Sequence, residues 1–220
     1  MRQIFVAALL LIISGCASGM SKEECLYADW RAIGYEDGAA GRNASAMSSR
    51  RVACADKAKV TPDIEAYLAG REAGLDQFCR PASGFDYGAR GGQYAGACQG
   101  RDESAFVAAY EKGLTHYGLA SNFDGASRAL AAAHADLDAI EHSITHAQAA
   151  LVNPATPHPA RLDHLAELKT LYGRRDKVRD AIPVLANDVD RAEADLEDYR
   201  REMADRDYAR NALRPSNARY

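Results

Sequence analysis

The sequence predicts a mainly α-helical protein: a small disulfide-stapled domain rich in glycine and aromatic residues, followed by a long antiparallel coiled-coil helical hairpin. Two observations predict this fold class. The four cysteines beyond residue 16 and most glycines lie before residue 120, and only Gly125 and Gly173 lie in 124–212. Small and branched apolar residues recur every seven positions in that second segment, which is typical of a coiled coil.

The N-terminus, MRQIFVAALLLIISGC, predicts a signal peptide at residues 1–15. Arg2 precedes ten apolar residues, and a membrane-spanning helix needs about 20. The segment ISGC resembles the bacterial lipobox, in which the cysteine becomes the first mature residue and carries acyl chains such as palmitate. Cys16 is therefore the expected lipidation site, with residues 16–24 as a tether. The alternative is an ordinary secreted protein that is cut elsewhere.

The remaining cysteines predict disulfides, because an even number in an exported chain is typical of disulfide bonding. They are Cys25, Cys54, Cys79 and Cys98. Three pairings are possible, and loop-closure entropy mildly favours the neighbouring pairs, 25 with 54 and 79 with 98. A zinc site made of cysteines would need the C-x2-C spacing that is missing here.

Residues 25–120 contain an imperfect repeat, aromatic-x2-Gly-x3-(Gly or aromatic). Its copies are Tyr67/Gly70/Gly74, Phe85/Gly88/Gly92 and Tyr110/Gly113/Tyr117, with a shifted version at Trp30/Gly34/Gly38. The four-residue spacing places these positions on one helical face. Because glycine inside a helix costs about 1 kcal/mol relative to alanine, the repeat predicts close helix–helix contact. Turns with positive φ are the alternative, above all at Gly91 and Gly92.

The glycine and aromatic positions are also the candidate ligand site. The candidate packing face or ligand groove comprises Trp30, Gly34, Tyr35, Gly38, Tyr67, Gly70, Gly74 and Gly88, with Tyr87 and Tyr94 as further aromatic residues. The nearby carboxylates of Asp29 and Asp37 would lie about 12 Å apart on a helix, which is too far for a glycosidase pair. We expect Asp29 to start a helix and Asp37 to pair with Arg31, Arg42 or Arg71.

Residues 124–212 predict the hairpin. Its first arm carries Leu130, Ala133, Leu137, Ile140, Ile144, Ala147 and Leu151 at heptad positions a and d, with Asp124 as a possible N-cap. The prolines of 153–159 predict the turn. The second arm continues the pattern at twelve positions, ten of which are apolar or small: Leu168, Leu171, Val178, Ile182, Leu185, Val189, Ala192, Leu196, Tyr199 and Met203, with Arg175 and Arg206 as the two exceptions.

Two features of the second arm need an explanation. Pro183 falls inside the series without changing its phase, which predicts a kink rather than a new element. The second arm is about twice as long as the first, so its apolar stripe at 185–212 should overhang. The glycine-rich domain, a second copy or another protein would then cover that stripe. Residues 213–220 form a tail.

Little in the sequence points to catalysis. His142 and His146 are one helical turn apart, but they fall on the solvated face of the heptad and lack the HExxH order of a metalloprotease. We therefore expect no enzyme, no metal and no cofactor. A formal net charge of −4 without a basic stripe argues against nucleic acid as a partner.

The order of motifs between Cys25 and Leu114 resembles the bacterial lipoproteins classed as domain of unknown function 2799. These motifs are CLYADWRAIGYEDGAAGR, YLAGREAGLDQFCRPASGFDYGARGGQYAGAC and FVAAYEKGL. The resemblance implies an exported, lipid-anchored envelope protein, and it indicates a location rather than a mechanism.

We expect an outer-membrane lipoprotein that faces the periplasm and is held by acyl chains on Cys16. Ala17 favours this membrane, because an aspartate after the lipidated cysteine is linked with inner-membrane retention. The hairpin would bind a protein partner or a second copy. The alternative is a periplasmic module that binds a small ligand or peptidoglycan in the aromatic groove.

Overall fold

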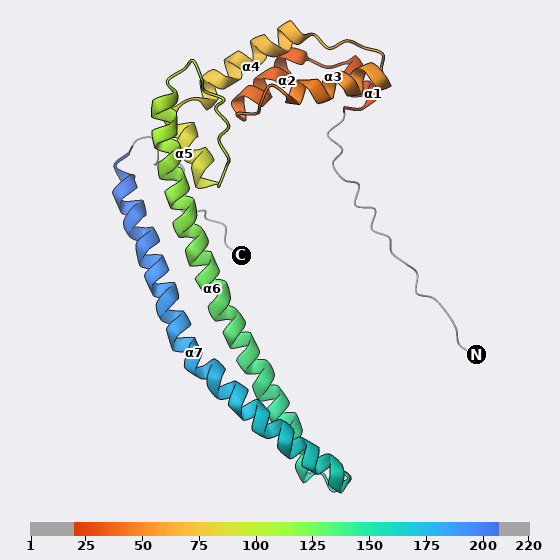
Figure 1. The fold of residues 1–220 in the computed structure, drawn as a ribbon, viewed down its shortest axis with the longest axis vertical. Coiled ribbons are helices and arrows are strands. Elements are labelled where there is room, and N and C mark those ends of the chain that lie inside the picture. The colour runs from red at the N-terminus through yellow and green to blue at the C-terminus, as the bar shows by residue number, and fades with distance from the viewer. Residues whose placement is uncertain (1–19, 207–220) are drawn as a thin grey trace, which may run out of the picture. The chain divides into compact units, whose positions relative to one another are not determined.

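The computed structural model describes residues 20–206, in which every regular element is a helix (Figure 1). The helices are α1 (Lys22–Leu26), α2 (Trp30–Ala39), α3 (Ala46–Lys57), α4 (Ile64–Phe78), α5 (Pro81–Ala89), α6 (Glu103–Val152) and α7 (His158–Ala204). This confirms the predicted fold class. The predicted signal peptide at 1–15, the lipidation site Cys16, the hairpin end at 207–212 and the tail at 213–220 lie outside the described residues.

The described chain divides into two compact units. Residues 20–79 and 94–101 form the first, and residues 80–93 and 102–206 form the second. The predicted boundary at 118–127, between domains at 25–120 and 124–212, is therefore wrong. Helix α6 runs unbroken through it, and Asp102 caps that helix by accepting a hydrogen bond from the Ala105 N–H, whereas Asp124 lies in the helix interior.

The change in composition along α6 reflects a change of packing partner. The first turns of α6 pack against α5 and need glycine there, whereas the later turns pack against α7 and use leucine, isoleucine and alanine. A shift in composition can therefore mark a new neighbour within one helix rather than a domain boundary.

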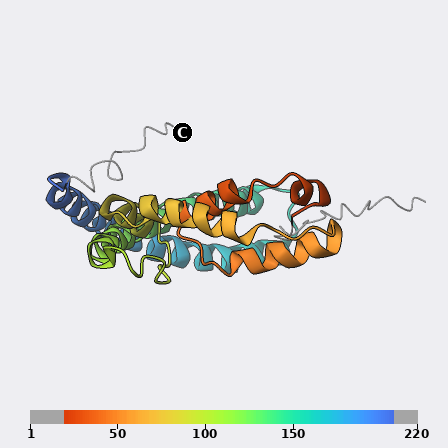
Figure 2. The same ribbon diagram turned by 90° about the horizontal axis from the view of Figure 1, so that it is seen from above.

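In the first unit, α2 and α4 lie side by side (Figures 1 and 2). Their contacts advance together along both helices, from Gly34 against Tyr67 to Gly38 against Arg71, so the two helices run parallel. The connection between them contains α3, which must return the chain to the starting end. Met47 of α3 packs in one buried cluster with Tyr67, Trp30 and the first disulfide.

Aspartate side chains begin three of the helices. Asp29, Asp63 and Asp102 each accept a hydrogen bond from the backbone N–H three residues later. Such caps satisfy an orphan N–H of the first helical turn and contribute about 1 kcal/mol. The predicted role of Asp29 as the start of a helix is confirmed.

The structure contains both disulfides that loop closure favours. Cys25 is bonded to Cys54, and Cys79 to Cys98, with Cα–Cα distances of 5.4 and 5.5 Å. All four cysteines are buried. The first bond joins α1 to α3, and the second joins the residue after α4 to the loop that precedes α6.

Helices α6 and α7 form the predicted antiparallel hairpin. Ile144 and Ala147 pack with Leu168 and Leu171 near the turn. Every predicted a and d position from Leu130 to Leu151 is buried or half-buried, which confirms the heptad. The turn occupies 153–157. Helix α7 continues through Pro183 as one element, and Figure 1 shows that it bends between its ends.

The predicted overhang of the second arm is wrong. Because α6 begins at Glu103, its 50 residues match the 47 residues of α7. Leu196 and Met203 are 4% and 0% exposed, and Met203 packs in a buried cluster with Phe85 and Ala109. The Tyr199 hydroxyl donates to the Lys112 carbonyl at 2.7 Å. The start of α6, which falls within the predicted glycine-rich domain, covers the stripe, so the first of the three predicted covers is confirmed.

Among residues 20–206, none of the helices combines the length and the apolar character that crossing a membrane requires.

The packing of the α7 end generates a first prediction. Met203→Ala removes a side chain that is fully buried against α5 and α6, and such substitutions cost about 2–5 kcal/mol. We expect faster amide hydrogen exchange across 196–204, measured by mass spectrometry. The neighbouring exposed residue supplies the control, Glu202→Ala, which should leave exchange unchanged. Equal exchange in both variants would contradict the packing described here.

Candidate functional site

The glycine faces predicted as a packing face or groove are closed by helix backbone. A methyl group at Gly34 would overlap the Tyr67 carbonyl oxygen, and one at Gly70 would overlap the Arg31 carbonyl oxygen. Gly38 and Gly74 meet the opposite backbone in the same way. The missing Cβ atoms therefore let α2 and α4 touch along their main chains, which confirms the prediction of close helix–helix contact.

Helices α5 and α6 repeat the same contact. Gly84, Gly88 and Gly91 follow Gly34, Gly38 and Gly41 at an interval of 50 positions, and Gly113 follows Gly74 at 39. The atoms that would block a side chain also correspond. Gly74 faces the Tyr35 carbonyl and Ala39 N–H groups, and Gly113 faces those of Phe85 and Ala89. The imperfect sequence repeat is therefore one parallel helix pair built twice.

The correspondence extends to the end of each pair. Gly41 and Gly91 have φ of 66° and 73°, where a Cβ atom is strained, and each lies against an aromatic ring. The rings belong to Phe78 of α4 and Tyr117 of α6. Positive φ at Gly91 confirms the alternative that the sequence left open for this glycine, whereas Gly92 does not adopt it.

The loop after the first helix is also held alike in the two pairs. Arg71 donates to the Arg42 carbonyl at 3.0 Å, and the Tyr110 hydroxyl donates to the Gly92 carbonyl at 2.9 Å. Arg71 and Tyr110 occupy equivalent positions on α4 and α6. Two different side chains therefore bind the same carbonyl in the two copies.

The aromatic candidates of the expected groove have different environments. Trp30 and Tyr67 are buried in the first unit at 8% and 0% exposure. Tyr35 is exposed, Tyr87 donates to the Gln93 carbonyl, and the Tyr94 hydroxyl accepts from the Cys98 N–H. The residues proposed for ligand binding serve packing or local hydrogen bonds, apart from Tyr35.

Asp37 is the buried charged group of the first unit, at 1% exposure. Its carboxylate accepts hydrogen bonds from Arg50, Arg42 and the Tyr67 hydroxyl. The expected pairing with Arg42 is confirmed, and neither Arg31 nor Arg71 binds it. Sequence spacing missed Arg50 and Tyr67, because they reach Asp37 from α3 and α4.

The partners of Asp37 determine its protonation. Burial by itself raises the pKa of the Asp37 carboxyl, but the hydrogen bonds from Arg50 and Tyr67, the charge of Arg50 and the bond from Arg42 outweigh burial and lower it. Burial and the hydrogen bond to Asp37 raise the pKa of Tyr67 to about 12. Every member is occupied by another, so the cluster is a structural cross-link rather than a poised acid or base.

The second helix pair dispenses with this buried charge. Tyr87 of α5 occupies the position equivalent to Asp37, and Phe106 of α6 occupies that of Tyr67. Phe106 is fully buried and stacks on Tyr110 at a centroid distance of 6.4 Å. The same backbone contact is thus supported by an ionic cluster in one copy and by aromatic packing in the other.

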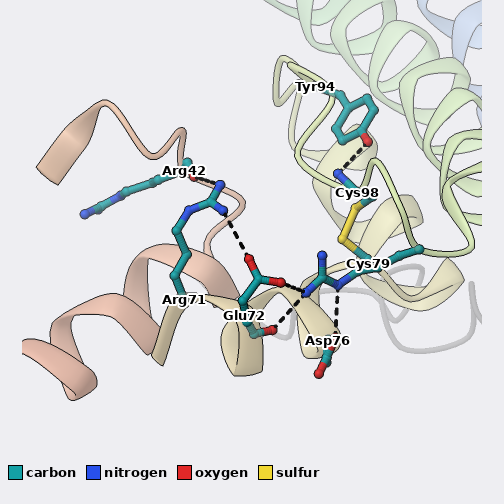
Figure 3. The surroundings of a disulfide bond; sticks show 8 residues. Arg42, Arg71, Glu72, Asp76, Cys79, Tyr94 and Cys98 are labelled. Atoms are coloured by element: carbon teal, nitrogen blue, oxygen red, sulfur yellow. Dashed lines mark hydrogen bonds and ion pairs between the residues drawn. A yellow bond between two sulfur atoms is a disulfide. The ribbon is translucent and has the colours of Figure 1, made fainter. Parts of the chain in front are cut away.

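A surface ion-pair cluster surrounds the second disulfide (Figure 3). Arg101 donates to the carboxylates of Glu72 at 2.6 Å and Asp76 at 3.0 Å, and also to the Glu72 carbonyl. These bonds tie the loop that carries Cys98 to the exposed side of α4. They reinforce what the Cys79–Cys98 bond holds covalently.

The histidines divide into surface and buried residues. His134, His142 and His146 are exposed on α6, as the heptad predicts, and no cluster of metal-ligating residues occurs within 20–206. His116 was missed by the sequence analysis. It is 9% exposed, lies 6.4 Å from the Phe85 ring, and neither ring nitrogen has a hydrogen-bond partner. Burial and the nearby Arg200 charge lower the pKa of His116.

The glycine contacts predict that replacing glycine by alanine lowers the stability at one site and raises it at another. Gly38→Ala forces a methyl group against the α4 backbone, and overpacking of this kind costs about 1–3 kcal/mol. Gly118→Ala is the matched control, because Gly118 is exposed in the α6 interior with open space around it. The free energy of unfolding of Gly118→Ala should rise by up to about 1 kcal/mol, because alanine favours a helix interior over glycine. Urea unfolding followed by circular dichroism measures both, and a neutral Gly38→Ala would refute the backbone contact.

The Asp37 cluster generates a pH prediction. Because folding lowers the pKa of Asp37, its contribution to stability is present above the unfolded value of about 3.9 and is lost as pH falls through the folded value. Asp37→Asn should therefore have a lower free energy of unfolding than the wild type at pH 7. That free energy should also fall less steeply than in the wild type as the pH is lowered to 3. Urea unfolding across this range checks it, with the exposed Asp56→Asn as control. Parallel pH profiles for wild type and Asp37→Asn would contradict the cluster.

Comparison with known proteins gives a match only at the level of a family model. No curated protein and no solved structure matches the chain. The model described as protein of unknown function (DUF2799) matches residues 29–115, which confirms the resemblance for this segment. The match begins at the N-cap of α2 and ends within the first turns of α6. The segment that resembles this family therefore contains both glycine-packed helix pairs, and most of the α6–α7 hairpin lies outside it.

Proposed function

We propose that the protein is a non-enzymatic lipoprotein of the bacterial outer membrane, facing the periplasm and anchored by acyl chains on Cys16. The glycine-packed helix pairs serve a structural role, and the α6–α7 hairpin serves as an interaction arm. The functional groups of the described chain support a structural role, since the four cysteines are bonded and Asp37 is fully engaged.

The distribution of exposed apolar residues on the hairpin carries this proposal. Along most of α6 and α7 the apolar stripe is turned inward, from Met203 to the cluster around Ile144. Away from the turn, three large apolar residues are also exposed: Val184 at 60%, Tyr117 at 46% and Leu114 at 37%. At the turn, however, Val152, Leu162 and Leu165 are 82%, 55% and 54% exposed. These residues define the hairpin tip. Figure 1 shows the turn at the opposite end of the α6–α7 pair from α5.

The tip replaces the predicted overhang as the contact site of the arm. Burying a leucine side chain stabilises a contact by about 1.5–3 kcal/mol relative to leaving it exposed. Three aliphatic side chains in one place can therefore contribute to a contact with a partner or a second copy. Helix α6 is about 75 Å long at 1.5 Å per residue, so the tip lies far from the α5 end of the hairpin.

The experiment is site-specific photo-crosslinking in living cells. A benzophenone amino acid at Leu162 should give a discrete adduct, while the same group at Lys177, exposed farther along α7, should give none. An adduct of twice the chain mass identifies self-association, and any other mass identifies a partner. Leu165→Ser should abolish the adduct because it removes apolar area from the tip.

Two results would count against the arm. Equal amounts of adduct from positions 162 and 177 would show that the partner does not contact the tip more than the rest of α7. An adduct that persists in Leu165→Ser would show that the exposed aliphatic residues do not make the contact.

A further inference from the structure

The segment from Met20 to Tyr27, which contains α1, exposes its two largest apolar side chains to solvent. Leu26 is 48% exposed, and Tyr27 is 87% exposed, the highest value for a large apolar residue within 20–206. Exposing an aliphatic and an aromatic side chain side by side is unfavourable in water unless another surface covers them.

This exposure does not result from a loose segment. Ser21 and Glu24 form a capping box, in which each side chain binds the other's backbone N–H. Cys25 is buried in its disulfide to Cys54. The Lys57 ammonium group donates to the Met20 carbonyl at 2.9 Å and so binds the start of the segment to the end of α3. Leu26 and Tyr27 are thus presented by a fixed scaffold.

The length of the tether places this segment near the membrane. Only residues 17–19 separate Cys16 from Met20, so the two Cα atoms can be at most about 14 Å apart. This step rests on the proposed function, in which Cys16 carries acyl chains in the bilayer. Met20 must then lie within about 14 Å of the lipid headgroups, and α1 follows it directly.

We infer that Leu26 and Tyr27 form a membrane-contact patch that lies against the lipid surface. Tyrosine is enriched at membrane interfaces, where its ring meets the acyl region and its hydroxyl stays hydrated. The patch fixes the orientation of the first unit on the membrane.

The size of the patch favours lipid over a second protein. A stable protein interface buries at least about 1,000 Å², which two side chains do not provide. A lipid surface needs no such area, because the anchor already holds the patch beside the bilayer at high effective concentration. Even a contact of one or two kcal/mol then determines the orientation.

The test uses the full lipidated chain in vesicles of phosphatidylethanolamine and phosphatidylglycerol, with and without bromine on the acyl chains. Tyr27→Trp reports on the patch. Ala44→Trp is the matched control. Ala44 is exposed and precedes the first residue of α3, whereas Lys57, which binds the start of the α1 segment, is the last residue of α3, about 18 Å away. The parent protein supplies the baseline from Trp30, which is buried. We expect brominated lipid to quench the tryptophan at position 27 well beyond the one at position 44.

Each outcome decides one of the two ideas. The mass of the N-terminal peptide first shows whether Cys16 is acylated. A Cys16 without acyl chains would overturn the proposed function together with the patch. With Cys16 acylated, equal quenching at positions 27 and 44 would overturn the patch alone. Quenching confined to position 27 supports both.

Discussion

The close approach of paired helices, with glycine against a carbonyl group of the neighbouring backbone, is the constraint on which this structure depends. Gly34 and Gly38 meet Gly70 and Gly74 across α2 and α4, and the same contact recurs between α5 and α6. A Cβ atom at any of these positions would push the main chains apart. Aromatic residues such as Tyr67 and Phe106 then fill the space at the ends of the contact, and the disulfides hold the connections in place.

The two helix pairs share some features and differ in others, and the shared features are those that the close backbone contact requires. Both keep the glycines, the positive-φ turn against an aromatic ring and a hydrogen bond to the carbonyl after it. The ionic cluster of the first pair has no counterpart in the second, where Tyr87 and Phe106 stand at the positions of Asp37 and Tyr67. Replacing a buried ionic cluster by well-packed apolar groups is often neutral or stabilising, so Asp37 is one of two solutions to the same packing problem.

The sequence predicted those features that depend on local periodicity. The heptads of 130–203, the turn after Val152 and the helix start at Asp29 follow from spacing and capping rules, and the structure confirms them. The start of α6 was misplaced because the change in composition near residues 118–127 indicated a domain boundary, whereas it reflects a change of packing partner along one helix. Arg50 could not be assigned to Asp37, since thirteen residues and a change of helix separate them. His116 carried no local signal at all.

The parallel direction of the paired helices has a consequence for folding kinetics. A hairpin such as α6–α7 forms from its turn outward, so each new contact closes a short loop. A parallel pair has no turn from which to start, because its first contact must close the whole connection between the two helices. Between α2 and α4 this connection is 24 residues long. Contacts between distant residues form slowly. Cys54 lies in the α2–α4 connection and Cys98 in the α5–α6 connection, so each disulfide restrains one of the two connections in advance. An oxidising compartment would then hasten the slow step as well as stabilise its product.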